Sequence, residues 1–72
     1  MKYVVIIEKG ENNLSAYVPD LPGCVSTGTT TDEVLKNIRE AITGHLEVMR
    51  EYGNPIPPPM SEAVAVEVEA TV

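Results

Sequence analysis

The first twenty-eight residues carry the apolar patterns of three short β-strands. Residues 2–8 are rich in β-branched and aromatic side chains and are apolar on both faces, as in a central strand. Residues 14–18 alternate and are expected to return antiparallel after a loop rich in Gly and Asn. Pro19 ends this strand because it has no amide hydrogen to donate. Residues 19–23 then predict a turn, and residues 24–28 a short third strand.

A helix is the strongest prediction in the chain. Residues 31–52 repeat apolar side chains at the spacing of an amphipathic helix. Thr30 and Glu33 have the spacing of a capping box, in which two side chains bond free backbone N–H groups of the first turn. Gly53 stands where a helix commonly ends, and Pro55 follows it. The pattern therefore predicts one helix over residues 31–52.

The remaining residues predict a stiff connection and a fourth strand. Residues 54–61 hold four prolines and are expected to be extended. Residues 63–71 alternate, with Val64, Val66 and Val68 on one face, as in a half-buried strand. A right-handed crossover would place this strand beside the first and parallel to it. The expected fold is α+β, with β-β-β-α-β order, sheet order 3-2-1-4 and one helix on one face.

One helix leaves the other face of such a sheet uncovered. A chain of 72 residues buries little apolar surface for its size, and its single cysteine cannot form an internal disulfide. Exposed apolar faces of this kind usually mark interfaces. The uncovered face includes either the row of Tyr3, Val5 and Ile7 or the row of Val4 and Ile6, and we predict a homo-oligomer or an obligate partner. The expected oligomer interface uses apolar side chains of the first and fourth strands: Tyr3, Val5, Ile7, Val64, Val66 and Val68.

The charge of the chain restricts its partners. With five basic and eleven acidic residues, the net charge is −6, which argues against direct binding to nucleic acid or to an anionic membrane. A basic protein is a better electrostatic match. The apolar run near the start is too short for a signal peptide or a membrane span. The cytoplasm is the expected location, and the lone thiol fits it.

No catalytic residue, cofactor site or metal site is predicted. Cys24 has no local base or cation and is expected to be a small buried side chain. His45, the single histidine, lies among apolar helix positions and is expected to be packed. Glu47 and Glu51 are expected on the solvated helix face. A carboxylate pair does acid–base or metal chemistry only where it converges in a pocket.

Several motifs resemble those of a known family. They are "AYVPDLPGC" at 16–24, "TGTTTDEVLKNIREAI" at 27–42 and "GNPIPPP" at 53–59. Together they resemble the HicB-like antitoxin family over nearly the whole chain. The resemblance implies a truncated ribonuclease H fold. It also implies a binding module, not an enzyme, that neutralises HicA-type toxins, which are small, basic, mRNA-cleaving proteins.

If the chain binds a toxin, as the resemblance implies, some of its exposed residues are expected to contact that toxin. The expected toxin contacts are the turn and the acidic face of the fourth strand: Asp20, Leu21, Pro22, Glu67 and Glu69. Residues 1–72 are expected to form a single HicB-like domain. The sequence ends at Val72, directly after the predicted fourth strand, so no C-terminal DNA-binding segment is expected.

Two other functions remain open from the sequence. One is an orphan structural or regulatory homo-oligomer, which the same uncovered face would serve. The other is a remnant of a metal-dependent nuclease, which would need several carboxylates converging with Glu8.

Overall fold

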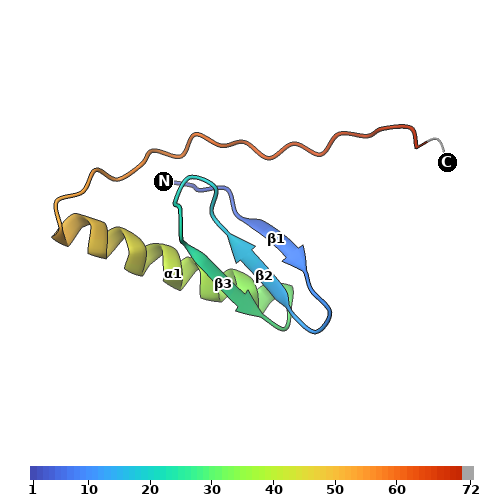
Figure 1. Cartoon of the computed structure of the whole chain (residues 1–72), viewed down its shortest axis with the longest axis horizontal. Helices are drawn as coiled ribbons and strands as arrows, with labels where there is room; N and C mark the ends of the chain where they lie inside the picture. The colour runs from blue at the N-terminus through green and yellow to red at the C-terminus, as the bar shows by residue number, and fades with distance from the viewer. Residues whose placement is uncertain (71–72) are drawn as a thin grey trace.

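The structure, a computed structural model, describes residues 1–70 as a three-stranded sheet, one helix and a long C-terminal segment (Figure 1). The elements are β1 (Ile6–Lys9), β2 (Leu14–Tyr17), β3 (Val25–Gly28) and α1 (Thr31–Glu51). The sheet is antiparallel with order β1-β2-β3. The helix crosses one face of the sheet and contacts β3 and β2. The predicted α+β class and the first four elements are confirmed.

A small aliphatic core joins the helix to the sheet. Its buried side chains come from β2, the turn after it and the first two turns of the helix: Ala16, Val18, Leu21, Cys24, Val34 and Ile38. Half-buried side chains surround them, including Tyr3, Val5 and Ile7 from the start of the chain. These three residues therefore face the helix side of the sheet.

The turn between β2 and β3 is part of this core. The Val18 amide donates to the Cys24 carbonyl at 3.2 Å, and the Leu21 amide donates to the Val18 carbonyl at 3.0 Å. Gly23 has φ of +84°, a backbone conformation that side chains disfavour. These bonds turn the chain sharply enough to bring Leu21 and Cys24 under the helix. The predicted turn is confirmed, with β2 ending one residue before the predicted limit and β3 starting one residue after it.

The predicted helix ends are confirmed with one difference. Thr30 Oγ1 accepts a hydrogen bond from the Glu33 amide at 3.1 Å. The Glu33 carboxylate accepts from the Thr29 amide at 2.9 Å, not from Thr30 as a standard capping box would have it. At the other end Gly53 has φ of +69°, and its amide and that of Asn54 donate to carbonyls of the last helical turn. This is a Schellman motif, and it ends the helix at Glu51, one residue before the prediction.

The N-terminal cap gives the first testable prediction. Thr30→Ala removes the oxygen that accepts from the Glu33 amide and is expected to lower the free energy of unfolding by about 1 kcal/mol. Thr31→Ala removes the same atoms from the first helical residue. It should change the free energy of unfolding by only about a few tenths of a kcal/mol. Urea unfolding followed by circular dichroism measures both. Equal losses in the two variants would contradict the capping role.

The predicted fourth strand is wrong within the described residues. Residues 60–70 contain no strand or helix, and every side chain there is exposed. Sheet order 3-2-1-4 is therefore replaced by a three-stranded sheet with β1 at one edge, and Thr71 lies outside the described residues. The predicted first strand, 2–8, is also shortened to Ile6–Lys9. Its early part has no neighbour, because β2 ends at Tyr17, opposite Ile6.

Candidate partner-binding surfaces

An apolar row crosses the sheet face that the helix leaves open. Ile6 pairs with Tyr17, and Tyr17 pairs with Val25, so the three side chains are cross-strand neighbours. Tyr17 is 39% exposed and Val25 is 64% exposed. We call Ile6, Tyr17 and Val25 the outer row. Tyrosine is enriched in the centre of protein interfaces, so this row is a candidate contact surface.

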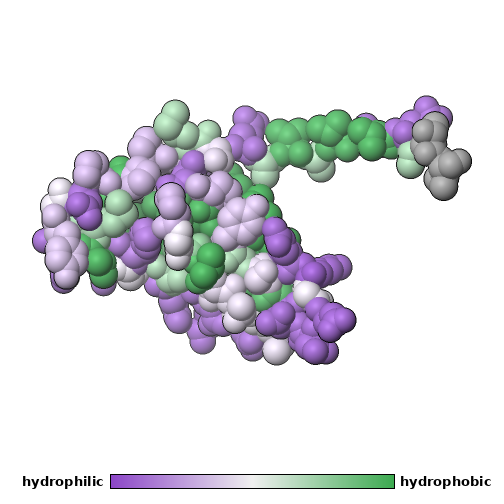
Figure 2. Space-filling view, viewed as in Figure 1, coloured by the Kyte–Doolittle hydropathy of each residue, from purple (hydrophilic) through white to green (hydrophobic). Residues whose placement is uncertain are grey.

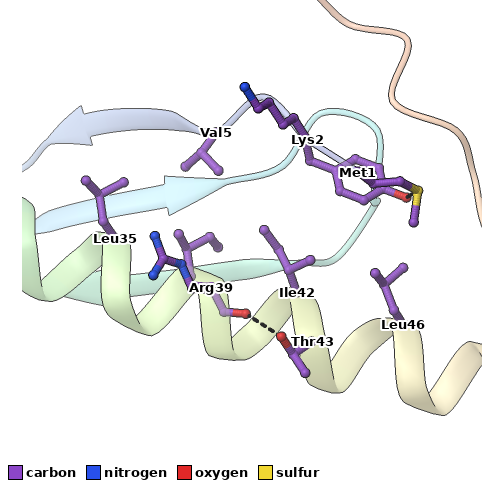
Figure 3. A pocket seen from close by; sticks show the side chains of 10 residues that line it. Met1, Lys2, Val5, Leu35, Arg39, Ile42, Thr43 and Leu46 are labelled. Atoms are coloured by element: carbon purple, nitrogen blue, oxygen red, sulfur yellow. Dashed lines mark hydrogen bonds between the residues drawn. The ribbon is translucent and has the colours of Figure 1, made fainter.

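A groove lies on the opposite side, between the start of the chain and the helix. Its volume is about 620 Å³. Val5 faces the helix across it, and Leu35, Ile42 and Leu46 project toward it from α1 (Figure 3). Lys2 and Arg39 also line it. The groove stays open because α1 lies over β2 and β3 and leaves the free side of β1 uncovered.

The C-terminal segment is attached to the body at two points. The Tyr3 hydroxyl donates to the Pro57 carbonyl. The Asp20 carboxylate accepts from the Met60 and Ser61 amides, both at 2.9 Å, and from the Ser61 hydroxyl at 2.8 Å. We call residues 62–70 the arm. The arm extends away from the body after Ser61, and its apolar side chains form the exposed green stretch in Figure 2.

Asp20 controls this attachment by its charge. The amide and hydroxyl of Ser61, with a smaller effect of the Met60 amide, lower the pKa of Asp20 below its ordinary value of 3.8. These donors favour the ionised carboxylate. The attachment is therefore complete above pH 3.8 and is lost as the pH falls through the lowered pKa.

Neutralising Asp20 should loosen the arm. Asp20→Asn keeps the shape but removes the charge, so hydrogen exchange of the Met60 and Ser61 amides at pH 7 should become faster by roughly an order of magnitude. Glu11→Gln, at an exposed position in the loop after β1, is the control and should leave these two amides unchanged. Unchanged exchange in Asp20→Asn would show that the carboxylate does not hold the arm.

The predicted toxin contacts are divided between surface and core. Leu21 is fully buried, so the expectation of an exposed side chain there is wrong; the backbone bonds of the turn direct it inward. Pro22 is exposed, and Asp20 is half-buried and bonded to the arm. Glu67 and Glu69 are exposed on the arm.

The predicted oligomer contacts fall on two surfaces. Tyr3 and Val5 line the groove, and Ile7 packs beside the core. Val64, Val66 and Val68 lie on the arm and are among the most exposed apolar side chains of the described chain. The sequence left open whether the uncovered face held Ile6, and it did not single out Tyr17 and Val25, although strand alternation places them on the same face.

The single cysteine lies in the core, as predicted. Cys24 is buried, and burial raises the pKa of its thiol, which disfavours the reactive thiolate. His45 is half-buried and lines a shallow hollow beside Cys24. Across residues 1–70 no three His, Cys, Asp or Glu side chains gather in a way that could hold a metal ion. In the same residues no helix combines the length and apolar character that crossing a bilayer requires.

Comparison with known proteins decides the family. The family model described as HicB-like antitoxin of bacterial toxin-antitoxin system matches residues 3–70. The chain belongs to the HicB-like antitoxin family. Its relatives include a UPF0150 protein of Thermoplasma acidophilum, 42% identical over 92% of this chain and 97% of the relative. A UPF0150 protein of Helicobacter pylori is 54% identical over 57% of each chain.

A longer relative and a solved structure extend the comparison. An uncharacterised protein of Haemophilus phage HP1 is 42% identical over 79% of this chain, which spans only 43% of that relative. A chain in the solved HicA3 and HicB3 toxin-antitoxin complex matches with a TM-score of 0.72 and 35% identity. The match covers 82% of this HicB-like chain and 70% of the solved one.

Proposed function

We propose that this HicB-like chain is the antitoxin of a toxin–antitoxin pair and neutralises a small, basic, mRNA-cleaving HicA-type toxin by covering its active site. The observation that carries this proposal is the 35% identity and TM-score of 0.72 to a chain from a HicA3 and HicB3 complex. The net charge of −6 supports a basic partner, since opposite charges favour association. The chain would act by binding, not by catalysis.

We assign the toxin contact to the outer side of the sheet. The outer row supplies an apolar centre with one tyrosine, the arrangement that protein interfaces favour. Pro22 in the turn is exposed and Asp20 beside it is half-buried, and Glu67 and Glu69 on the arm add exposed carboxylates. Leu21 is buried beneath this turn, so it would stabilise the shape of the turn and not contact the toxin.

The expected compartment is the cytoplasm. Cys24 is a free thiol, and free thiols persist in reducing compartments. A HicA-type toxin cuts mRNA, so the antitoxin must be present where mRNA is translated.

Co-expression tests the proposed function. The proposal predicts that a small basic protein is encoded beside this chain and arrests growth when it is expressed alone. Growth should recover when the chain is co-expressed. The two proteins should then co-purify as a complex. A variant with Tyr17→Ala and Val25→Ala removes most of the outer row and should rescue growth less well, while Val48→Ala, on an exposed part of the helix, should rescue fully. Growth arrest that persists with the unaltered chain would exclude the antitoxin role.

A further inference from the structure

The arm has the pattern of a strand with no partner. Val64, Val66 and Val68 share one face and are 69%, 73% and 77% exposed. The alternate positions carry alanine and glutamate, and this alternation is typical of a strand with one buried face. A fully exposed apolar strand is a template for pairing with another chain. The arm therefore needs a surface that accepts both its backbone and its valines.

The free edge of β1 is such a surface. In the order β1-β2-β3, the far side of β1 has no neighbour within residues 1–70. Residues 2–5 precede it and are rich in β-formers, yet no backbone hydrogen bond outside the helix and strands involves them in the described chain. A strand laid along this edge would pair with these backbone groups. Its side chains on one face would enter the groove beside Tyr3 and Val5.

The arm and the groove match in chemistry. The groove is lined mainly by aliphatic side chains, including Val5, Leu35, Ile42 and Leu46, which suit a row of valines (Figure 3). Its charged lining residues, Lys2 and Arg39, are both basic. Of the charged residues of the arm, Glu62 shares the face of the valines and would bring a carboxylate to this basic lining, whereas Glu67 and Glu69 lie on the opposite face.

The arm is directed away from the groove of its own chain. The connection touches Tyr3 near the start of β1 and then reaches Asp20, in the turn between β2 and β3. Between these two contacts the chain crosses the end of the sheet, and none of the residues that line the groove comes from the arm. Beyond Ser61 it extends past the body, and the molecule reaches 51 Å in its longest dimension (Figure 1). Residues 62–70 span about 30 Å when extended, enough to follow β1 of a neighbour.

We propose that two copies of this chain exchange arms, each arm adding a fourth strand to the free edge of β1 in the other copy. Val64, Val66 and Val68 of one copy fill the groove of the other between β1 and α1. The arrangement is reciprocal, so it closes as a two-fold symmetric dimer and leaves neither arm unpaired. Residues 2–5 then gain the strand neighbour that a single copy does not supply.

Complementation between two defective chains tests the exchange. The first variant ends after Ser61, which keeps the Asp20 bonds and every buried core residue but removes the arm. The second is Leu35→Lys, which places a charge in the groove at a position already 39% exposed. Light scattering after size exclusion should give about twice the 7.8 kDa chain mass for the unaltered protein. Each variant alone should be monomeric, and an equimolar mixture should form a one-to-one heterodimer.

Adjacent substitutions on the arm provide the matched control. Val66→Lys puts a charge on the face that enters the groove and should raise the dimer dissociation constant by about tenfold or more. Ala65→Lys adds the same charge one residue earlier, on the opposite face, and should change it by less than about threefold. Circular dichroism establishes that each variant is folded. Arg39→Glu replaces Leu35→Lys if the latter unfolds, since Arg39 is an exposed lining residue.

Three results would overturn the proposal. The first is a monomeric unaltered chain at 100 µM concentration, roughly the upper range for a specific dimer. The second is a dimer that persists without the arm, because another surface would then form it. The third is a mixture of the two variants that stays monomeric, because the arm would then fold back on its own chain or bind a different protein.

Discussion

Leu21→Ala is expected to remove most of the stability of the chain at 25 °C. The side chain is fully buried between the sheet and the helix, although it comes from a turn. Removing a buried leucine side chain costs about 3–5 kcal/mol, because it loses apolar burial and leaves a cavity. A domain of this size has a free energy of unfolding of roughly 5 kcal/mol, so little stability would remain.

A urea titration followed by circular dichroism measures this loss. Val25→Ala is the control, because Val25 lies a few residues further on, is 64% exposed and should cost less than about 1 kcal/mol. A Leu21→Ala protein nearly as stable as the control would show that the turn does not belong to the core. The result also bears on the proposed toxin contact, because the buried Leu21 side chain holds the turn that carries the exposed Pro22.

Reversing the two arm glutamates should weaken toxin binding. Glu67→Lys with Glu69→Lys is expected to raise the dissociation constant for a basic toxin by about tenfold at low salt, chiefly by slowing association. Both positions are exposed on the polar face of the arm. If the valine face enters the groove, which lies on the helix side, the glutamates lie on the side of the outer row. One continuous surface would then present tyrosine and carboxylates to the toxin.

The control variant changes the net charge by the same amount, but on the helix instead of the arm. Glu47→Lys with Glu51→Lys reverses two exposed glutamates on the helix and should change the dissociation constant by less than about threefold. The difference between the two variants should shrink at high salt, because exposed charges are screened. Surface plasmon resonance gives the association rates. Equal weakening by both pairs would mean that net charge alone attracts the toxin.

Local features of the fold could be predicted from the sequence because their causes are local. The hydroxyl of Thr30 and the glycine at 53 act within one helical turn, so both helix ends followed from neighbouring residues. The turn before Cys24 likewise depends on adjacent prolines and on Gly23. The low reactivity expected of Cys24 followed from the absence of a local base, and its burial agrees with it.

The partner of a strand is not a local property. The alternation at Val64, Val66 and Val68 indicates that one face becomes buried, but it does not say which surface, or which copy of the chain, covers it. The Asp20 bonds decide the direction of the arm, and they join residues some forty positions apart, at Met60 and Ser61. Such a contact leaves no pattern in either segment alone.

The inward direction of the Leu21 side chain could not be predicted from the sequence either. Because Leu21 lies between two prolines, the sequence indicated an exposed surface loop at this position. Its burial depends on hydrogen bonds from Leu21 to Val18 and from Cys24 to Leu21, which rotate the middle of the turn inward. The outer row could have been found, since Ile6, Tyr17 and Val25 follow from strand alternation and register.

The central claim is that this HicB-like chain silences a HicA-type toxin by binding it. The most direct measurement is RNA cleavage by the purified small basic protein that we expect to be encoded beside this chain, titrated with the purified chain. We expect cleavage to fall linearly and to stop near one chain per toxin, with the Tyr17→Ala and Val25→Ala variant needing a large excess. Cleavage that continues undiminished at a tenfold excess of the unaltered chain would contradict the claim.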